Sequence, residues 1–452
     1  MARINTPLAP IHTHEGAKAQ HINPLQQLRR SVMACMLWED QFYEDGVTIA
    51  QRIAEEVKNV TPEQAAEIAI EAREKMKLRH APLWIVREMA RLPKHRLLVA
   101  DTLARVIQRA DELTEFVALY WKDGKQPLSK QVKLGLARAF TKFDRYQLAK
   151  YNRDDAVKLR DVLFLSHAKP IDEHQAETFK MLVDGTLETP DTWEVNLSAG
   201  KDKKETWEML LAEKKLGALA LLRNLRNMQE VSVDEALVVS ALADMKVERV
   251  LPFRFVSAAE AAPRLENAIE GAMLRSLSQR QGLPGRTVVI IDVSGSMYGA
   301  NISAKSEMDR AKVACTLACM AREVCENPII FATAGSDSAQ RHQTAEVPAR
   351  RGFGLVDAIY GMCRPLGGGG IFLTQAMDWI VAQGITSADR VIVITDEQDC
   401  DRANAPSKAK LIGKSNYLIN VGSYQNGIGY GSWTHIDGFS ESVLDYITAV
   451  ES

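Results

Sequence analysis

The chain has few cysteines, no long apolar run without charges and almost no net charge. Its 452 residues include six cysteines, and none stands in a Cys-x-x-Cys pair, which argues against a disulfide framework and against a zinc ribbon. No apolar stretch approaches the roughly 18–20 residues that a membrane-spanning helix requires. The sequence after Met1 also lacks the apolar core of a secretory signal. We therefore expect a protein of the reducing cytoplasm.

Charge is balanced overall but unevenly distributed along the chain. With 46% hydrophobic and 25% charged residues, the composition is that of a globular protein, and its length predicts two or three domains. The formal net charge is -2, yet the segment from Tyr120 to Pro170 holds twelve basic and five acidic residues, a local net charge of +7. A basic block inside an otherwise acidic chain requires an explanation.

Up to about residue 265 the spacing of apolar residues predicts helices. Thr61-Pro62-Glu63-Gln64 and Ser232-Val233-Asp234-Glu235 read as capping boxes that open helices. Apolar residues from Trp207 to Leu225 mark one face of a long amphipathic helix. Many helices of modest length joined by short loops favour a bundle or a helical-repeat solenoid.

After Pro284-Gly285 the pattern changes to strands that alternate with helices. Met308 to Glu326 and Thr374 to Gln383 are helical stretches. Alternating strands and helices predict a doubly wound parallel sheet. The short apolar runs typical of buried parallel strands are Thr287–Ile291, Ile329–Ala332, Val391–Ile394 and Tyr417–Val421.

Acidic and hydroxyl side chains follow two of these strands. Asp292, Ser294 and Ser296 come directly after the first run, and Asp396 ends a later one. Ligands of open α/β sheets lie at the carboxyl ends of strands, and oxygen ligands completed by water suit Mg²⁺. These residues predict a metal site, although Asp, Ser and Gly also form ordinary strand-to-helix turns.

A run of four glycines, Gly367–Gly370, resembles no nucleotide-binding loop. A phosphate-binding P-loop would end in Gly-Lys-Ser or Gly-Lys-Thr, and a dinucleotide site would need a further glycine. Neither is present, so this segment is interpreted as a flexible loop.

The basic block has two interpretations. Lysines and arginines at helical spacing usually form a solvated face. Aromatic rings interleaved with such charges can instead stack on unpaired bases while the cations contact phosphates. For His167 the alternative interpretation is a helix-capping residue. The cations concerned are Lys130, Lys133, Arg138, Lys142, Arg145, Lys150 and Arg153, and the rings are Tyr146, Tyr151 and His167.

The strand-end residues resemble the metal-ion-dependent adhesion site of a von Willebrand factor A domain. The resemblance rests on Asp292-x-Ser294-x-Ser296-Met297 and on Asp396 after a later strand. It implies a divalent cation, Mg²⁺ or a similar ion, as cofactor. The family places a Thr just after a Gly pair, where this chain has Ile371, so Thr374 is the hydroxyl that would have to replace it.

Further motifs resemble the Ro autoantigen family. Lys150-Tyr151 followed by Leu163-Phe164-Leu165-Ser166-His167-Ala168-Lys169-Pro170 is similar to its RNA-binding module, called TROVE, and so are the segments around Trp207-Glu208 and Pro252-Phe253-Arg254-Phe255. The order of these motifs, with an adhesion-type domain behind them, resembles that of a Ro protein of the bacterial or phage type. The resemblance implies a ring of α-helical HEAT-like repeats followed by an α/β doubly wound von Willebrand A-type domain. The implied division is an extension over 1–24, TROVE over 25–265 and the A-type domain over 286–452.

The resemblance also implies a non-catalytic RNA-binding function in a ribonucleoprotein. Y-like small RNA would bind on a basic outer surface, and single-stranded 3′ ends of misfolded RNA would bind in a central cavity, for RNA quality control. Lys150 and His167 match family positions facing that cavity; the family's intervening Arg aligns with Asp154, beside Arg153. An exoribonuclease such as polynucleotide phosphorylase is the implied protein partner. The alternatives are a metal-dependent adhesion scaffold for an acidic protein and, less favoured because it lacks a paired-carboxylate array, a nuclease.

Overall fold

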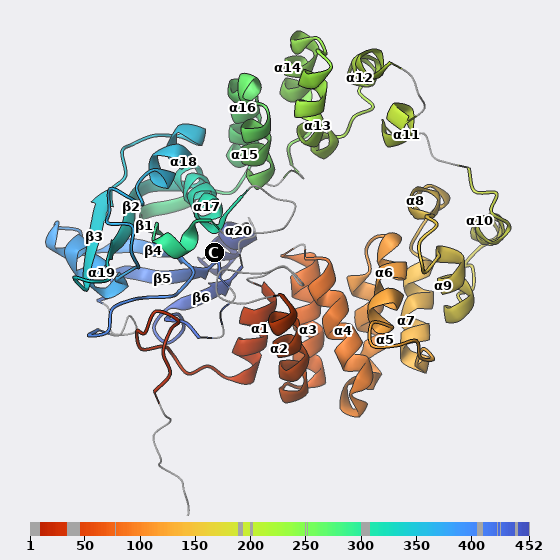
Figure 1. Cartoon of the computed structure of the whole chain (residues 1–452), viewed down its shortest axis with the longest axis horizontal. Helices are drawn as coiled ribbons and strands as arrows, with labels where there is room; N and C mark the ends of the chain where they lie inside the picture. The colour runs from red at the N-terminus through yellow and green to blue at the C-terminus, as the bar shows by residue number, and fades with distance from the viewer. Residues whose placement is uncertain are drawn as a thin grey trace, which may run out of the picture.

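The computed structural model of the chain consists of a curved row of helices that leads into a six-stranded sheet (Figure 1). Within the part of the chain that the structure describes, no helix combines the length and the apolar character needed to cross a membrane. The described residues are 10–33, 46–76, 78–188, 193–198, 202–248, 250, 252–299, 308–404, 410–422, 424, 426–438 and 442–451.

The first half of the helical row has a hydrophobic core of its own, which extends from Leu28 to Leu182. The predicted capping box at Thr61 is confirmed, because its side chain accepts from Gln64 N and Gln64 returns a bond to Thr61 N. The helices of this half are α1 (Pro24–Met33), α2 (Gly46–Asn59), α3 (Pro62–Glu74), α4 (His80–Arg91), α5 (Arg96–Val106), α6 (Asp111–Tyr120), α7 (Lys130–Phe140), α8 (Arg145–Tyr151), α9 (Leu159–Ser166) and α10 (Glu173–Asp184).

The second half departs from two sequence-based predictions. The long helix predicted from Trp207 to Leu225 is wrong: the chain breaks between α12 and α13, where Lys214 adopts a positive φ of 52°. The second capping box is also displaced, because Asp234 rather than Ser232 caps α14 by accepting from Ala236 N. The helices are α11 (Trp193–Ser198), α12 (Lys203–Ala212), α13 (Ala218–Glu230), α14 (Glu235–Asp244), α15 (Pro252–Ala261) and α16 (Glu266–Ser278).

The sheet has the order β3-β2-β1-β4-β5-β6, with β1 parallel to both β2 and β4. All four predicted strands are confirmed. The polar edge strands β3 and β6 were not predicted, and β3 is antiparallel, so the sheet is mixed rather than wholly parallel. The strands are β1 (Leu283–Asp292), β2 (Cys325–Ser336), β3 (Arg341–Glu346), β4 (Ala388–Thr395), β5 (Gly413–Asn420) and β6 (Thr434–Asp437).

Successive side chains of β1 point to opposite faces of the sheet and belong to two separate hydrophobic cores, as expected for a strand buried on both faces. Val289 and Ile291 belong to the core that includes α17 (Arg310–Val324), α18 (Gly352–Tyr360) and α20 (Ser442–Glu451). Val288 and Ile290 belong to the core on the opposite face, which includes α19 (Leu373–Ala382). The sheet is therefore the middle layer of three.

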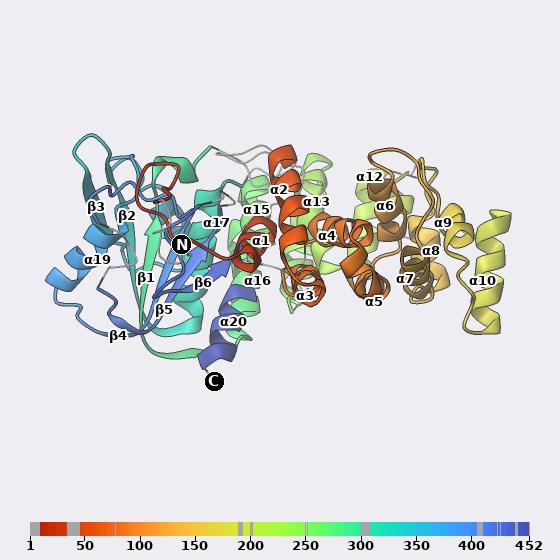
Figure 2. The same cartoon turned by 90° about the horizontal axis from the view of Figure 1, so that it is seen from below.

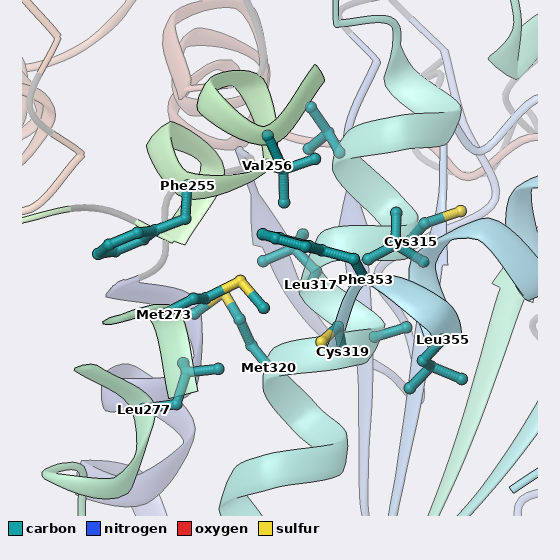
Figure 3. Close-up of a cluster of buried hydrophobic side chains, with 14 of the residues drawn as sticks. Phe255, Val256, Met273, Leu277, Cys315, Leu317, Cys319, Met320, Phe353 and Leu355 are labelled. Atoms are coloured by element: carbon teal, nitrogen blue, oxygen red, sulfur yellow. The ribbon is translucent and has the colours of Figure 1, made fainter. Parts of the chain in front are cut away.

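The core of the second helical half continues into the α/β part without interruption. Figure 3 shows Met273 of α16 directed toward Met320 of α17, in one cluster that also includes Phe255 of α15 and Phe353 of α18. Helices α12–α16 and this face of the sheet thus share one hydrophobic unit. The division of the chain at residues 265 and 286 stays a prediction.

The other end of the helical row also contacts the sheet, because α1 packs against β6. Arg30 of α1 is fully buried and pairs with Glu397, the second residue after β4. Its guanidinium also donates to the carbonyl oxygens of Tyr424 at 2.6 Å and Asn426 at 3.2 Å. Helical row and α/β part therefore join at both ends, and the predicted ring followed by an A-type domain is confirmed. Both views place α10 at the far end of the molecule from the sheet (Figures 1 and 2).

Candidate metal site and RNA-binding surface

The metal-site candidates meet where the order of the strands reverses, between β1 and β4. Such a switch point opens a crevice at the carboxyl ends of the two strands. Asp292 ends β1, Asp396 follows β4, and both are fully buried. The strand context that suggested the site also explains why these two carboxylates converge.

Hydrogen bonds connect four of the five candidate ligands. Ser294 N donates to Asp292 Oδ1 at 2.8 Å, and Ser294 Oγ lies 3.2 Å from Ser296 Oγ. Ser296 Oγ in turn donates to Asp396 Oδ2 at 2.8 Å. Two carboxylates and two hydroxyls from one loop and one neighbouring strand therefore surround one small region.

Ionisation of the carboxyl groups in this region is unfavourable, because they are buried and lie close to one another. Burial raises the pKa of Asp292 to about 7, and the nearby Asp396 carboxylate raises it as well. Burial likewise raises the pKa of Asp399 to about 7, with contributions from Asp401 and Asp292. Like charges held close together without water favour protonation or a bound cation. The donor chemistry therefore fits a hard divalent ion.

The fifth candidate, Thr374, has a hydroxyl whose surroundings leave it unsatisfied. It lies in the first turn of α19, and its Oγ is buried without a hydrogen-bond partner among the described residues. A buried hydroxyl without a partner is unfavourable and is explained if it faces an ion. Ile371, which stands at the family's Thr position, is fully buried in the core around α19.

The glycine run packs directly on the loop that carries the two serines. Gly295 N donates to Gly369 O at 3.1 Å, and a Cβ added to Gly295 would lie 2.9 Å from Gly368 O. Gly367 and Gly368 adopt positive φ angles of 94° and 69°, which glycine tolerates without strain. The run is thus a tight packing element, which corrects its interpretation as a flexible loop.

Sequence reasoning missed two residues that shape this region. Thr395, the last residue of β4, donates to Asp292 Oδ2 at 2.6 Å and fixes its orientation. Asp399 accepts from Leu373 N at 2.8 Å and so holds the start of α19 near the site. The acidic run after β4 could have indicated Asp399, whereas no motif in the sequence indicated Thr395. Among the described residues no group of three or more His, Cys, Asp or Glu side chains could hold a metal, so the hydroxyls are essential to this candidate.

Two of the predicted RNA-binding cations are held by contacts within the protein. Arg138 of α7 forms an ion pair with Asp101 of α5. Lys142 donates to the carbonyl oxygens of Ala104, at 2.5 Å, and Ile107, and burial lowers its pKa. Both side chains thus hold neighbouring helices together, which makes them weaker candidates for phosphate contact.

Four candidate cations have no ion pair within the part of the chain that the structure describes. Lys130 and Lys133 lie on α7, whereas Lys150 and Arg153 lie at the end of α8 and just beyond it. Asp154, aligned with the family's Arg, pairs with Lys158, so Arg153 is the cation available there. Of the two interleaved tyrosines, Tyr146 is 51% exposed, whereas Arg109 covers the ring of Tyr151.

His167 has a backbone role and an exposed ring. It is the C-cap of α9, with a left-handed φ of 54°, and its N–H donates to Phe164 O at 3.3 Å. The cap is made by the backbone, so the imidazole is free to contact a ligand. Figure 1 shows α8 on the side of the row that lies nearest α11 and α12.

Comparisons with known proteins agree with this architecture. A family model described as the TROVE domain matches residues 184–346. The crystal structure of the Deinococcus radiodurans Ro (Rsr) protein superposes with a TM-score of 0.61 and 17% identity, covering 94% of this chain and 99% of that one.

Telomerase protein component 1 of Rattus norvegicus and of Mus musculus is 36% identical over 96 residues, which is 20% of this chain. The chain spans only about 4% of the length of these two curated relatives. The chain therefore contains a segment, residues 184–346, that matches the TROVE domain, and it shares the overall fold of the Deinococcus Ro protein.

Proposed function

We propose that this protein binds structured Y-like RNA and the single-stranded 3′ ends of misfolded RNA, without cleaving them, as part of cytoplasmic RNA quality control. The observation that carries the proposal is a set of four cations that have no ion pair among the described residues: two lie on α7, one lies at the end of α8 and one just beyond it. The same segment exposes the rings of Tyr146 and His167, and the chain that follows matches the TROVE domain over residues 184–346. Cations meet phosphates, and rings stack unpaired bases.

The two kinds of RNA bind to two different surfaces. Lys130 and Lys133 of α7 contact the phosphates of structured RNA. Lys150, Arg153 and His167 contact a single-stranded 3′ end. The chain supplies no chemical step in this function, so degradation of the captured RNA falls to a separate exoribonuclease, such as polynucleotide phosphorylase.

The outer surface is tested by the salt dependence of binding. Replacing Lys130 and Lys133 by Gln should reduce the slope of log affinity against log salt for structured RNA by about 1.4–1.8, since each phosphate contact contributes about 0.7–0.9. The measurement is a titration of a structured RNA at several salt concentrations.

Lys214→Gln with Lys215→Gln is the matched control, because it removes the same charge from the second half of the row, where both lysines have acidic partners. An equal slope for wild type and the α7 variant would show that Lys130 and Lys133 form an ordinary solvated face.

We further propose that Asp292, Ser294, Ser296 and Thr374 hold Mg²⁺ or a similar divalent ion, with Asp396 binding through a water molecule. The orphaned hydroxyl of Thr374 supports this ligand set. The ion supplies charge neutralisation at the switch point. RNA contacts lie on the helical row, so a short unstructured oligonucleotide should bind equally well in Mg²⁺ and in EDTA.

The variant Thr374→Val separates the effect of ion binding on stability from the effect of side-chain packing. In EDTA the variant should be as stable as wild type, because the hydroxyl that it removes has no hydrogen bond to lose. With Mg²⁺ at about ten times its dissociation constant, wild type should gain about 1.4 kcal/mol and the variant less.

Thermal unfolding with and without Mg²⁺ measures both effects. Thr395→Val is the control, since it removes the bond to Asp292 and should destabilise under both conditions. Identical Mg²⁺ responses of wild type and Thr374→Val would exclude Thr374 from the ligand set.

A further inference from the structure

A shallow pocket lies between α9 and α10, at the end of the molecule farthest from the sheet (Figures 1 and 2). Its apolar lining includes Leu163 and Phe164 of α9 and Phe179 and Val183 of α10. Phe179 is 6% exposed and packs edge-on against Phe140, with ring centroids 5.2 Å apart. The floor of the pocket therefore includes a buried aromatic ring.

One wall of the pocket is an aromatic ring that the fold leaves in water. The Phe164 side chain is 59% exposed, although neighbouring positions of α9 are buried in the core. Phe164 is continuous with the apolar lining of the pocket, and a concave surface of this kind can bind a flat or apolar ligand. Phe164 is the kind of ring on which an unpaired base stacks.

Charged groups of both signs stand at the edge of this apolar lining. His167 and Lys180 supply donors, and Asp184 supplies a carboxylate. Lys180 and Asp184 have no ion pair among the residues that the structure describes. The pocket thus offers an apolar centre, a cationic edge and one free carboxylate.

The position of Asp184 is unfavourable for the helix that carries it. It is the last residue of α10, which Gly185 terminates in a left-handed conformation with φ 71°. A negative charge at a helix C-terminus opposes the helix dipole by about 0.3–1 kcal/mol, and Lys180, one turn earlier on α10, forms no ion pair with it among the described residues. An uncompensated charge at the rim of an aromatic pocket points to a ligand that donates hydrogen bonds.

We propose that this pocket holds an unpaired guanine base of the bound RNA. Guanine stacks on Phe164, and its N1–H and N2–H donate to the two oxygens of Asp184. Lys180 faces a flanking phosphate, and the ring of His167 stacks the neighbouring base. Uracil presents a single N–H between two carbonyl oxygens, which the carboxylate repels. The inference rests on the proposed RNA-binding function and adds a base preference to it.

The test uses three short unstructured oligonucleotides: oligouridine, the same oligomer with one guanosine near its 3′ end, and the same oligomer with inosine in that place. Wild type should bind the guanosine oligomer about fivefold or more tightly than oligouridine, the discrimination expected of a bidentate contact. Inosine lacks the N2 amino group and should lose most of this advantage.

Two variants assign the preference to the pocket. Asp184→Asn preserves the shape of the side chain and should abolish the preference for guanosine over inosine while binding oligouridine at least as well as wild type. Phe164→Ala should weaken binding of all three oligomers, whereas Ile171→Ala, which removes another exposed apolar side chain (72% exposed) outside the pocket, should not.

The outcomes distinguish failure of the guanine site from failure of RNA binding as a whole. Equal affinity of wild type for the three oligomers, or an unchanged preference in Asp184→Asn, overturns the guanine site and leaves RNA binding intact. Failure of wild type to bind any of the oligomers, under low-salt conditions that favour phosphate contacts, overturns the proposed function as well.

Discussion

Replacing Arg30 by Met should lower the free energy of unfolding by about 3–5 kcal/mol, the usual cost of removing one partner of a buried ion pair. Arg30 and Glu397 are both fully buried, and they join α1 to the loop that follows β4. Without the guanidinium, His435 is the cationic neighbour that remains to Glu397 among the described residues. The contact between α1 and the α/β part should therefore open or unfold first.

Urea unfolding of wild type and variant measures this loss. Arg29→Met is the matched control one residue away: Arg29 is 38% exposed and pairs with Glu71 at 2.5 Å, and exposed pairs contribute only about 0–1 kcal/mol. The double variant Arg30→Met with Glu397→Asn should recover part of the loss, because it leaves no unpaired buried charge on this pair and Asn tolerates the left-handed φ of 65° at position 397. Similar losses for the two arginine variants would show that the buried pair has no special role.

The pH dependence of stability gives a second readout of the same network. Burial alone would lower the pKa of His435, but Asp437 and Glu397 raise it to about 9. Its Nε2 lies 2.5 Å from Glu397 Oε1, and its Nδ1 lies 3.3 Å from Asp437 Oδ2. A raised pKa means that the stabilisation is complete below the unfolded value, about 6.5, and is lost as the pH rises through 9. Wild type should lose stability across this window.

The sequence predicted what depends on local pattern. Apolar runs identified β1, β2, β4 and β5, and the strand-end positions of Asp292 and Asp396 led to the candidate metal site. The polar edge strands β3 and β6 carry no apolar run, so no pattern revealed them. The closed ring came from the resemblance to Ro proteins, because no spacing within the chain encodes it.

Contacts between distant parts of the chain escaped prediction for a physical reason. Arg30 and Glu397 lie 367 residues apart, and nothing near either residue indicates its partner. From the sequence, Arg138 and Lys142 were as good candidates for phosphate contact as Lys130. Their acceptors lie on α5 and just after it, so only the packing of α5 against α7 distinguishes them.

The preference for a single-stranded 3′ end should depend on Lys150 and His167. Lys150→Ala combined with His167→Asn should weaken binding of a 3′-tailed RNA by about ten- to a hundredfold, since a stacked base alone contributes about 1–3 kcal/mol and a phosphate contact is lost as well. Asparagine is preferred to alanine at position 167 because the left-handed φ of 54° is strained for most residues and Asn tolerates it. The melting temperature should stay within a few degrees, because neither side chain belongs to the core.

The measurement is a competition between a 3′-tailed RNA and a blunt duplex of the same sequence, for wild type and variant at one salt concentration. Lys58→Ala with His80→Asn removes the same two groups from α2 and α4, where both have acidic neighbours, and should leave the affinity unchanged. An equal loss for the blunt duplex would show that the two residues act as general positive charge. An unchanged affinity for the tailed RNA would remove both from the site, whereas a large drop in melting temperature would assign His167 to the cap of α9 alone.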